Sequence, residues 1–203
     1  MGRTAEQSLQ LQAERREAIV HAAWRMAASG GLSAVTIRAI AGEIGFTTGI
    51  VMHHFATKEA ILEEMIDRLY GGLRDLYRAS IERAGPHERL ERMLLSCLPL
   101  KPDTAFGWKL SVVLQGEALR SPAIAKLHQR HYKVFEEDIA QELALLQASG
   151  RIPAGTDLTL ARMRLVALME GIGTNHVLRP RAMPAKLQRQ LMLDELARLL
   201  EGG

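Results

Sequence analysis

Apolar residues recur along this chain at the three- and four-residue spacing of amphipathic helices, and no stretch alternates apolar and polar residues as a half-buried strand does. The clearest period follows Thr57, a favourable N-cap, and its apolar positions are Leu62, Met65, Ile66, Leu69, Leu73, Leu76 and Tyr77. Glycine and proline residues separate the periodic segments. We therefore predict an all-α fold with nine helices, at residues 11–29, 36–43, 47–53, 58–84, 87–98, 104–120, 123–148, 157–178 and 185–200.

The segment from Thr36 to Leu62 predicts a helix-turn-helix. Ala41 is small where two short helices cross, and Gly45 tolerates the positive φ of a tight turn. The apolar residues around this turn form its small core: Ile40, Ile44, Phe46, Ile50 and Val51. The short second helix has the size and polarity of a helix that enters a DNA major groove. A helical hairpin without a DNA role is the alternative, because the Ala-x-x-x-Gly turn alone fits both.

Three motifs in this region resemble the DNA-binding domain of the tetracycline-repressor family: Gly45-Phe46-Thr47-x-Gly49, His53-His54-Phe55 and Lys58-Glu59-x-Ile61-Leu62. Thr47 to Phe55 is most similar to the choline-responsive repressor branch that controls glycine betaine synthesis. The resemblance covers residues 14–80 and is weaker in 103–119 and 167–171. Met52 and His54 stand where the family usually has tyrosines, so phosphate contacts made by tyrosine hydroxyls elsewhere are not carried over.

Positions at helix N-termini and on the exposed face of the second helix predict the DNA contacts. Thr47, Thr48 and His53 are expected to face the groove, together with Gly49 and Met52. The expected phosphate contacts are Thr36 and Lys58, with Arg38 at the rim. Thr36 also has a structural role as an N-cap.

The net charge of +3 is weak support for this assignment, because residues 1–80 hold nine basic and nine acidic side chains. Local placement matters more. Arg15, Arg16, Arg38 and Lys58 are expected near the groove-facing side.

Thr104 to Leu119 is apolar nearly all round, which predicts a buried helix. Trp108, Ser111 and Gln115 share one face of it, and a buried hydroxyl or amide needs a neighbouring partner or a ligand. Both alternatives stay open from the residues alone. The resemblance to ligand-sensing regulators implies a cavity lined by Met93, Cys97, Trp108, Ser111, Gln115 and Phe135.

The resemblance also implies choline or a related quaternary amine as ligand, which several aromatic rings would have to surround. Only Phe106, Trp108, Tyr132 and Phe135 are available between residues 81 and 203, so the identity of the inducer stays open.

The last two helices carry long apolar stripes, which pack either within one chain or across a two-fold axis. DNA recognition favours a homodimer, because a second helix-turn-helix doubles the contacts. Leu191 and Leu196 of the last helix are the expected dimer contacts. Glu170 lies inside one of these stripes, either as a pocket or interface acid or as an edge residue that reaches solvent.

Several other classes of protein are disfavoured. Cys97 is the single cysteine, so no internal disulfide is expected; it is either a small buried hydrophobe or a redox sensor. His128-x-x-His131 has metal-ligand spacing but no further ligand nearby, so we expect two solvated histidines and no metal. There is neither a phosphate-binding loop nor a nucleophile elbow, so we expect no cofactor and no enzyme.

No run approaches about 18 uninterrupted apolar residues and the first 16 residues are polar, so a cytoplasmic protein without a membrane partner is expected.

The expected domains are a helix-turn-helix domain at 1–56, a connecting helix at 57–82 and a ligand-binding and dimerisation domain at 83–203. The expected function is a homodimeric repressor that binds a palindromic operator in double-stranded DNA and is released by a small-molecule inducer. One alternative is a DNA-binding structural or recruitment protein without ligand control. Another is a small all-α metal-dependent enzyme around His128 and His131.

Overall fold

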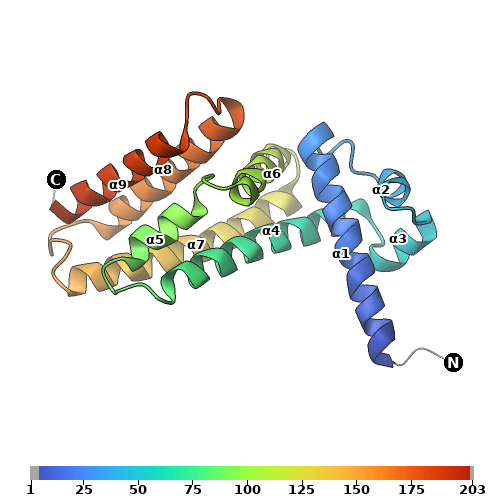
Figure 1. Ribbon diagram of the computed structural model, residues 1–203, viewed down its shortest axis with the longest axis horizontal. Coiled ribbons are helices and arrows are strands. Elements are labelled where there is room, and N and C mark those ends of the chain that lie inside the picture. The colour runs from blue at the N-terminus through green and yellow to red at the C-terminus, as the bar shows by residue number, and fades with distance from the viewer. Residues whose placement is uncertain (1–4, 202–203) are drawn as a thin grey trace. The chain divides into compact units, whose positions relative to one another are not determined.

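The computed structural model describes residues 5–201, and this part of the chain contains nine helices and no strand (Figure 1). The helices are α1 Ala5–Gly30, α2 Ile37–Glu43, α3 Thr48–His54, α4 Lys58–Ile81, α5 Arg89–Cys97, α6 Pro102–Ala118, α7 Pro122–Ala148, α8 Leu158–Leu178 and α9 Ala185–Glu201. The all-α prediction is confirmed. The outer limits of the expected domains, at residues 1–4 and 202–203, lie outside the described residues.

The largest difference from the predicted helices is at the start of α1, which begins at Ala5 and not near Leu11. Residues 5–10 lack an apolar stripe, yet they contain no glycine or proline and continue the helix into water. Gln10 donates a side-chain hydrogen bond to Glu14 at 3.2 Å, a pair at the favourable four-residue spacing.

Proline marks the start of two helices and is not confined to the loops before them. Pro102 and Pro122 are the first residues of α6 and α7. A proline fits there because its fixed φ suits a helix and its missing N–H has no intrahelical partner. Both helices therefore begin one or two residues before the positions predicted from the apolar pattern.

The chain divides into two compact units. The first comprises residues up to Arg68 together with Val113–Leu127, and the second comprises Leu69–Val112 and His128–Gly203. Helices α4, α6 and α7 each contribute residues to both units.

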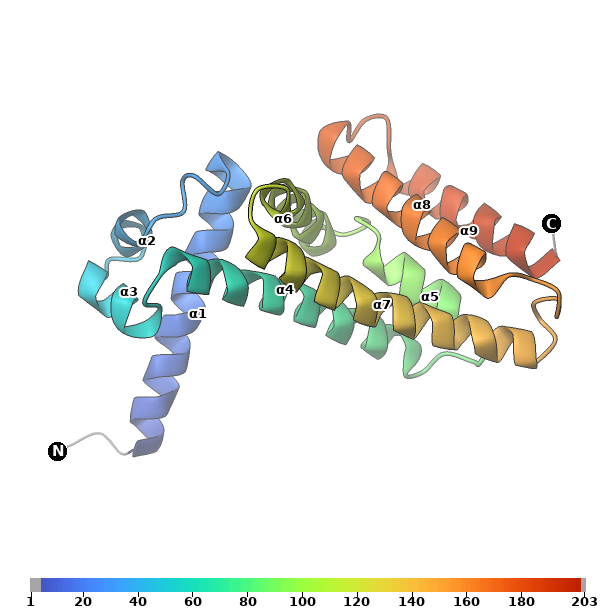
Figure 2. The same cartoon turned by 180° about the vertical axis from the view of Figure 1, so that it is seen from behind.

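In the first unit, α2 and α3 lie side by side and both contact α1 (Figure 2). The fully buried side chains of this core come from each of the three helices and from α4, and include Ile19, Ile40, Val51 and Ile61. Packing of the two short helices on a longer one is what holds them, because a seven-residue helix is marginal alone.

In the second unit, α9 packs against α5 and α8. Its core contains Met93, Cys97, Trp108, Phe135 and Leu196, all buried. Two polar clamps tie α7 to its neighbours. The Arg89 guanidinium binds both carboxylate oxygens of Glu142, at 2.7–3.1 Å, and the Tyr77 hydroxyl donates to Asp138.

Candidate DNA interface and ligand site

The helix-turn-helix is closed by backbone hydrogen bonds around Gly45. The Phe46 N–H donates to the Ala41 carbonyl at 2.9 Å, and Gly45 has φ 68°. That φ lies in the left-handed region, where glycine is favoured. Ala41 is 3% exposed, which confirms a small residue at the close approach of the two helices. The predicted turn geometry is therefore correct.

Two threonines cap the helices of this motif. The Thr36 hydroxyl accepts from the Ala39 N–H at 3.1 Å, and the Thr47 hydroxyl accepts from the Ile50 N–H at 3.3 Å. A capping hydroxyl uses a lone pair in this contact, so its own O–H stays available to donate. Both threonines therefore have a structural role and can still donate to a phosphate oxygen.

The outer face of α3 is polar and open to solvent. Thr47, Thr48, Gly49, Met52 and His53 are all exposed, as is Arg38 on α2. Met52 is 53% exposed although it is apolar, whereas its neighbour Val51 is fully buried. Hydroxyl, imidazole and thioether groups together suit the donors, acceptors and thymine methyl groups of a major groove.

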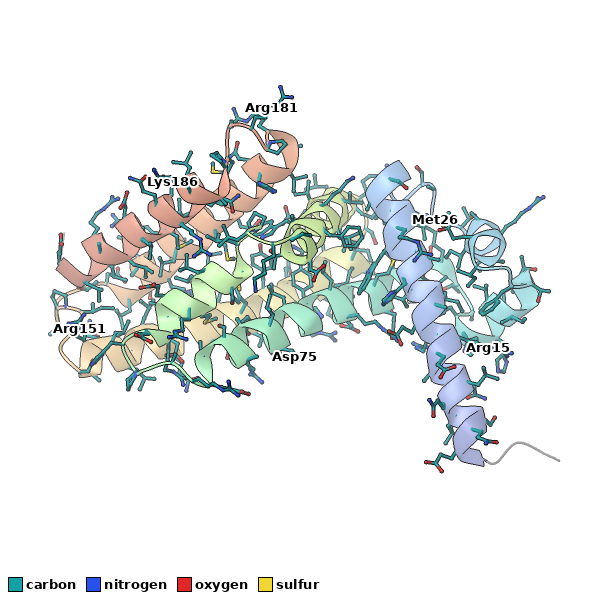
Figure 3. The ribbon with its side chains drawn as sticks, in the orientation of Figure 1. Arg15, Met26, Asp75, Arg151, Arg181 and Lys186 are labelled. Carbon is teal, nitrogen blue, oxygen red and sulfur yellow. The ribbon has the colours of Figure 1, made fainter. Side chains whose placement is uncertain are left out.

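Basic residues near α3 differ in how they are engaged. Arg38 forms no ion pair with any residue in the described part of the chain. Arg15, labelled in Figure 3, lies over the Phe46 ring at 6.0 Å. Lys58 donates from Nζ to the Leu32 carbonyl at 2.5 Å and so ties the loop before α2 to the start of α4. Its ammonium has two further N–H donors, so a phosphate contact stays a prediction.

Arg16 is engaged within the protein, at the end of α3. Its guanidinium donates to Glu64 at 2.6 Å and to the His54 carbonyl at 3.2 Å, and lies over the Phe55 ring at 4.2 Å. Arg16 therefore lies beside the end of α3, as expected from the sequence, but its charge is paired with a carboxylate on α4 and it is not proposed as a DNA contact. Arg16 instead fastens the end of α3 to α1 and α4.

His54 packs against its neighbours and is half-buried. Its ring meets that of His53 edge-on at a centroid distance of 5.3 Å. Burial, and then the neighbouring charges of His53, Arg15 and Arg16, lower the pKa of His54. A packing role fits this environment better than a DNA contact, whereas His53 is exposed.

In the second unit, Trp108 is held on two sides. Its indole Nε1 donates to the Cys97 carbonyl at 2.8 Å. Its ring lies so close to α8 that a Cβ at Gly173 would be 2.2 Å from it. Met93, Cys97 and Phe135 join the main core, and burial raises the pKa of the Cys97 thiol to about 12. A thiol of this kind holds no thiolate near neutral pH, which supports its interpretation as a small buried hydrophobe.

Ser111 leads to a group of residues that the sequence argument missed. Its hydroxyl lies 3.5 Å from the Tyr70 hydroxyl of α4. Tyr70 stacks on His131 with a centroid distance of 5.2 Å, and His128 stacks on Tyr132 at 4.5 Å. We call Tyr70, His128, His131 and Tyr132 the ring cluster. Gln115 lies one turn beyond Ser111 on α6, in the part of that helix that groups with the first unit.

The environment of the ring cluster shifts two pKa values. Burial raises the pKa of Tyr70 to about 12; the carboxylate of Glu170 adds to this rise, and the Ser111 hydrogen bond opposes it. Burial and the neighbouring His131 lower the pKa of His128. The expectation of two solvated histidines is wrong, because both imidazoles pack on tyrosine rings.

A signal for Tyr70 was present in the sequence. It follows Ile66 by four residues and precedes Leu73 by three, so it shares the apolar stripe of α4. Because Tyr70 precedes residue 81, it was not among the aromatic residues expected near the ligand. His128 and His131 were considered only for their metal-ligand spacing.

Within residues 5–201, no group of three or more histidine, cysteine, aspartate or glutamate side chains is arranged to hold a metal ion. None of the described helices combines the length and apolar character needed to cross a membrane.

Comparison with known proteins agrees with this arrangement. Residues 19–65 match the model of bacterial regulatory proteins of the tetR family, and residues 86–201 match the C-terminal model of BetI-type transcriptional repressors. The HTH-type transcriptional regulator UidR of Escherichia coli K12 is 26% identical over 161 residues, which cover 77% of this chain and 79% of UidR. The HTH-type transcriptional regulator BetI of Agrobacterium fabrum is 28% identical over 169 residues, which cover 81% of this chain and 78% of BetI.

A solved structure extends the match to nearly the whole fold. A crystal structure described as a transcriptional regulator from Saccharomonospora viridis in complex with choline has a TM-score of 0.83 and 27% sequence identity, covering 91% of this chain and 96% of that one. The two family models together span both units. The chain therefore belongs to the TetR family and carries the C-terminal domain of its BetI-type transcriptional repressors.

Proposed function

We propose that this chain is a homodimeric repressor that binds a palindromic operator through α3 and leaves it when a small molecule binds the second unit. The observation that carries the DNA part is the exposed polar face of α3, with Thr47, Thr48 and His53 presented on a capped helix. The DNA contacts proposed are those expected from the sequence, without Arg16. Two copies of α3 must then reach successive major grooves, about 34–36 Å apart or a multiple of that spacing.

Exposed apolar residues on the last two helices support the homodimer. Leu160, Met163 and Leu178 of α8 are 46%, 58% and 66% exposed, and Leu187 and Leu193 of α9 are 36% and 37% exposed. Between those of α8 lie two exposed small residues, Ala167 and Gly171, which allow a second helix to approach closely. This surface, which we call the α8–α9 face, is the proposed dimer interface.

The α8–α9 face differs from the dimer contacts expected from the apolar pattern of the sequence. Leu196 is 7% exposed and lies in the core of its own chain, and Leu191 packs against that core. The stripe that contains them holds α9 onto α5 and α8. The exposed leucines of α9, Leu187 and Leu193, lie on either side of this stripe.

For the inducer we propose a small organic cation, with choline as the first compound to test. The ring cluster and Trp108 offer aromatic faces, and Glu170 supplies a negative charge near Tyr70. Such faces attract ammonium groups through the ring quadrupole. The lowered pKa of His128 keeps its imidazole uncharged near neutral pH, which avoids repulsion of a cation. The choline complex of the Saccharomonospora viridis regulator supports the same class of ligand.

Helix α4 connects the proposed cation site to the helix-turn-helix. Tyr70 belongs to the second unit, whereas residues 58–68 of the same helix belong to the first. The rings pack on one another, so a ligand between them must separate Tyr70 from His131. If DNA binds better to the packed arrangement and the ligand to the separated one, each weakens the binding of the other by the same factor.

Thermal unfolding with added choline tests the ligand part. A ligand that binds only the folded chain raises the melting temperature as its concentration rises. We expect this rise for the wild type, with tetramethylammonium as a second cation and glycerol as an uncharged control. Glu170→Gln should reduce the rise. A melting temperature that no cation changes would favour the DNA-binding protein without ligand control.

A further inference from the structure

A second hollow lies in the second unit, formed by the end of α4 and the residues just after it, by α5, by the loop that follows α5 and the start of α6, and by α9. It has a volume of about 570 Å³ and shares no residue with the ring cluster. Its lining contains four cationic side chains and no acidic one; the cations are Arg83, Arg92, Lys101 and Arg189. We call this hollow the basic groove.

Three of these four charges lack a counter-charge. Arg92 pairs with Glu88 at 2.9 Å, one helical turn away on α5. Arg83, Lys101 and Arg189 form no ion pair with any residue from 5 to 201. They come from three separate segments, so their convergence is a property of the fold and not of one basic run. Like charges on an apolar wall attract an anion more strongly than isolated surface cations do.

The remaining wall of the basic groove is largely apolar. Leu98 is fully buried beneath it, and Leu76 is 37% exposed at its edge. The two serines in the lining use their hydroxyl protons inside the protein, since Ser80 donates to the Tyr77 carbonyl at 2.7 Å and Ser96 to the Met93 carbonyl at 2.8 Å. Recognition of an anion therefore falls to the cations, and the leucines offer burial to an apolar tail.

We propose that the basic groove binds an amphipathic carboxylate, whose head group pairs with Arg83, Lys101 or Arg189 and whose alkyl chain covers the leucines. Arginine and carboxylate form paired hydrogen bonds of good geometry. Pockets of a few hundred Å³ suit small organic ligands, and the basic groove is large enough for a medium-length alkyl chain. The leucine wall disfavours a DNA backbone, whose phosphates and sugars would leave it uncovered. The proposal goes beyond the cation site and does not depend on it.

Titration calorimetry of the full chain with decanoate tests this site. We expect saturable binding of one decanoate per chain that weakens as salt is added. Decanol, which has the tail without the charge, and inorganic phosphate, which has charge without a tail, should each bind at least about tenfold more weakly. Equal affinity for decanoate and either of these compounds overturns the proposal, as does the absence of decanoate binding.

Matched variants locate the ligand. Arg83→Ala and Lys101→Ala should each lower decanoate affinity at least about fivefold, and Lys133→Ala, an exposed lysine of α7 outside the groove, should not change it. All three side chains are exposed, so the variants should keep the wild-type melting temperature. Decanoate binding that Arg83→Ala and Lys101→Ala leave unchanged contradicts the site. Binding of a non-operator duplex that these two variants weaken, in place of decanoate binding, assigns the groove to DNA and also overturns it.

Discussion

The Arg16 guanidinium and the Glu64 carboxylate meet at 2.6 Å, and the same carboxylate accepts from Arg68 at 2.7 Å. Arg16 also holds the carbonyl of His54, the last residue of α3. One side chain of α1 thus joins the end of the recognition helix to α4. Because α4 continues into the second unit, this contact is part of the proposed route between ligand and DNA.

Replacement of Glu64 by Gln should weaken this junction. The hydrogen bond from Arg16 lowers the pKa of Glu64 from its ordinary 4.5, although burial opposes that shift. The stabilisation by Glu64 is therefore present above pH 4.5 and is lost as the pH falls through the pKa that Glu64 has in the folded chain. Urea unfolding should show that Glu64→Gln is less stable than wild type at neutral pH and loses less on acidification. Glu43→Gln, which removes an exposed pair with Arg25, is the control. Equal acid sensitivity of wild type and Glu64→Gln would contradict this role.

Lys58→Ala should change both DNA binding and folding. If one ammonium N–H reaches a phosphate, affinity falls for all sequences and the salt slope decreases by about one. Loss of the hydrogen bond to Leu32 should also lower the free energy of unfolding by about 1 kcal/mol. DNA affinity measured as a function of salt concentration reports the first effect, and urea unfolding reports the second. A lower stability with an unchanged salt slope would show that Lys58 acts only within the protein.

Stability should fall on mild acidification because of His128. Burial and His131 lower its pKa from the ordinary 6.5, so the unfolded chain gains a proton at a pH where the folded chain does not. The contribution of His128 to the free energy of unfolding is complete above pH 6.5 and is lost as the pH falls toward the pKa that His128 has in the folded chain. The urea midpoint of His128→Gln should decline less below pH 6.5 than that of wild type, with the exposed His87→Gln as control. His54 contributes in the same direction, so part of the decline should remain. Identical declines in both variants would refute the assignment.

Replacing Leu187 and Leu193 by Glu should give monomers that stay folded and lose operator binding. Each leucine is already nearly two-thirds buried in its own chain, so covering the rest contributes roughly 0.5–1 kcal/mol, and the two-fold axis doubles this contribution. Sedimentation at micromolar concentration measures the change. Leu145→Glu, at another exposed leucine in the second unit, should leave the dimer intact. A monomeric wild type would end the dimer model.

The sequence predicted the number and type of helices because apolar periodicity and proline positions are local signals. It placed the turn at Gly45 and the caps at Thr36 and Thr57 for the same reason. The start of α1 was missed because a solvated helix needs no apolar stripe.

The sequence pattern did not predict contacts between segments that are far apart in the chain. Arg16 and Glu64 are 48 residues apart, and Tyr70 and Ser111 are 41 apart. Nothing in the local pattern indicates that these side chains meet. The ring cluster and the basic groove were missed for this reason, and Leu191 and Leu196 were chosen as dimer contacts although they serve their own chain.

Selection from a random DNA pool, followed by sequencing of the bound fraction, tests the central proposal most directly. We expect the wild type to enrich an inverted repeat whose half-site centres are about ten base pairs, or a multiple of that spacing, apart. Thr48→Ala combined with His53→Ala removes two exposed groups that are proposed to face the groove, without touching a cap, and should abolish or alter the enrichment. Thr159→Ala, at an exposed threonine of α8, should enrich the wild-type sequence. Recovery of no repeat by the wild type, or of the same repeat by the α3 variant, would contradict recognition of a palindromic operator through α3.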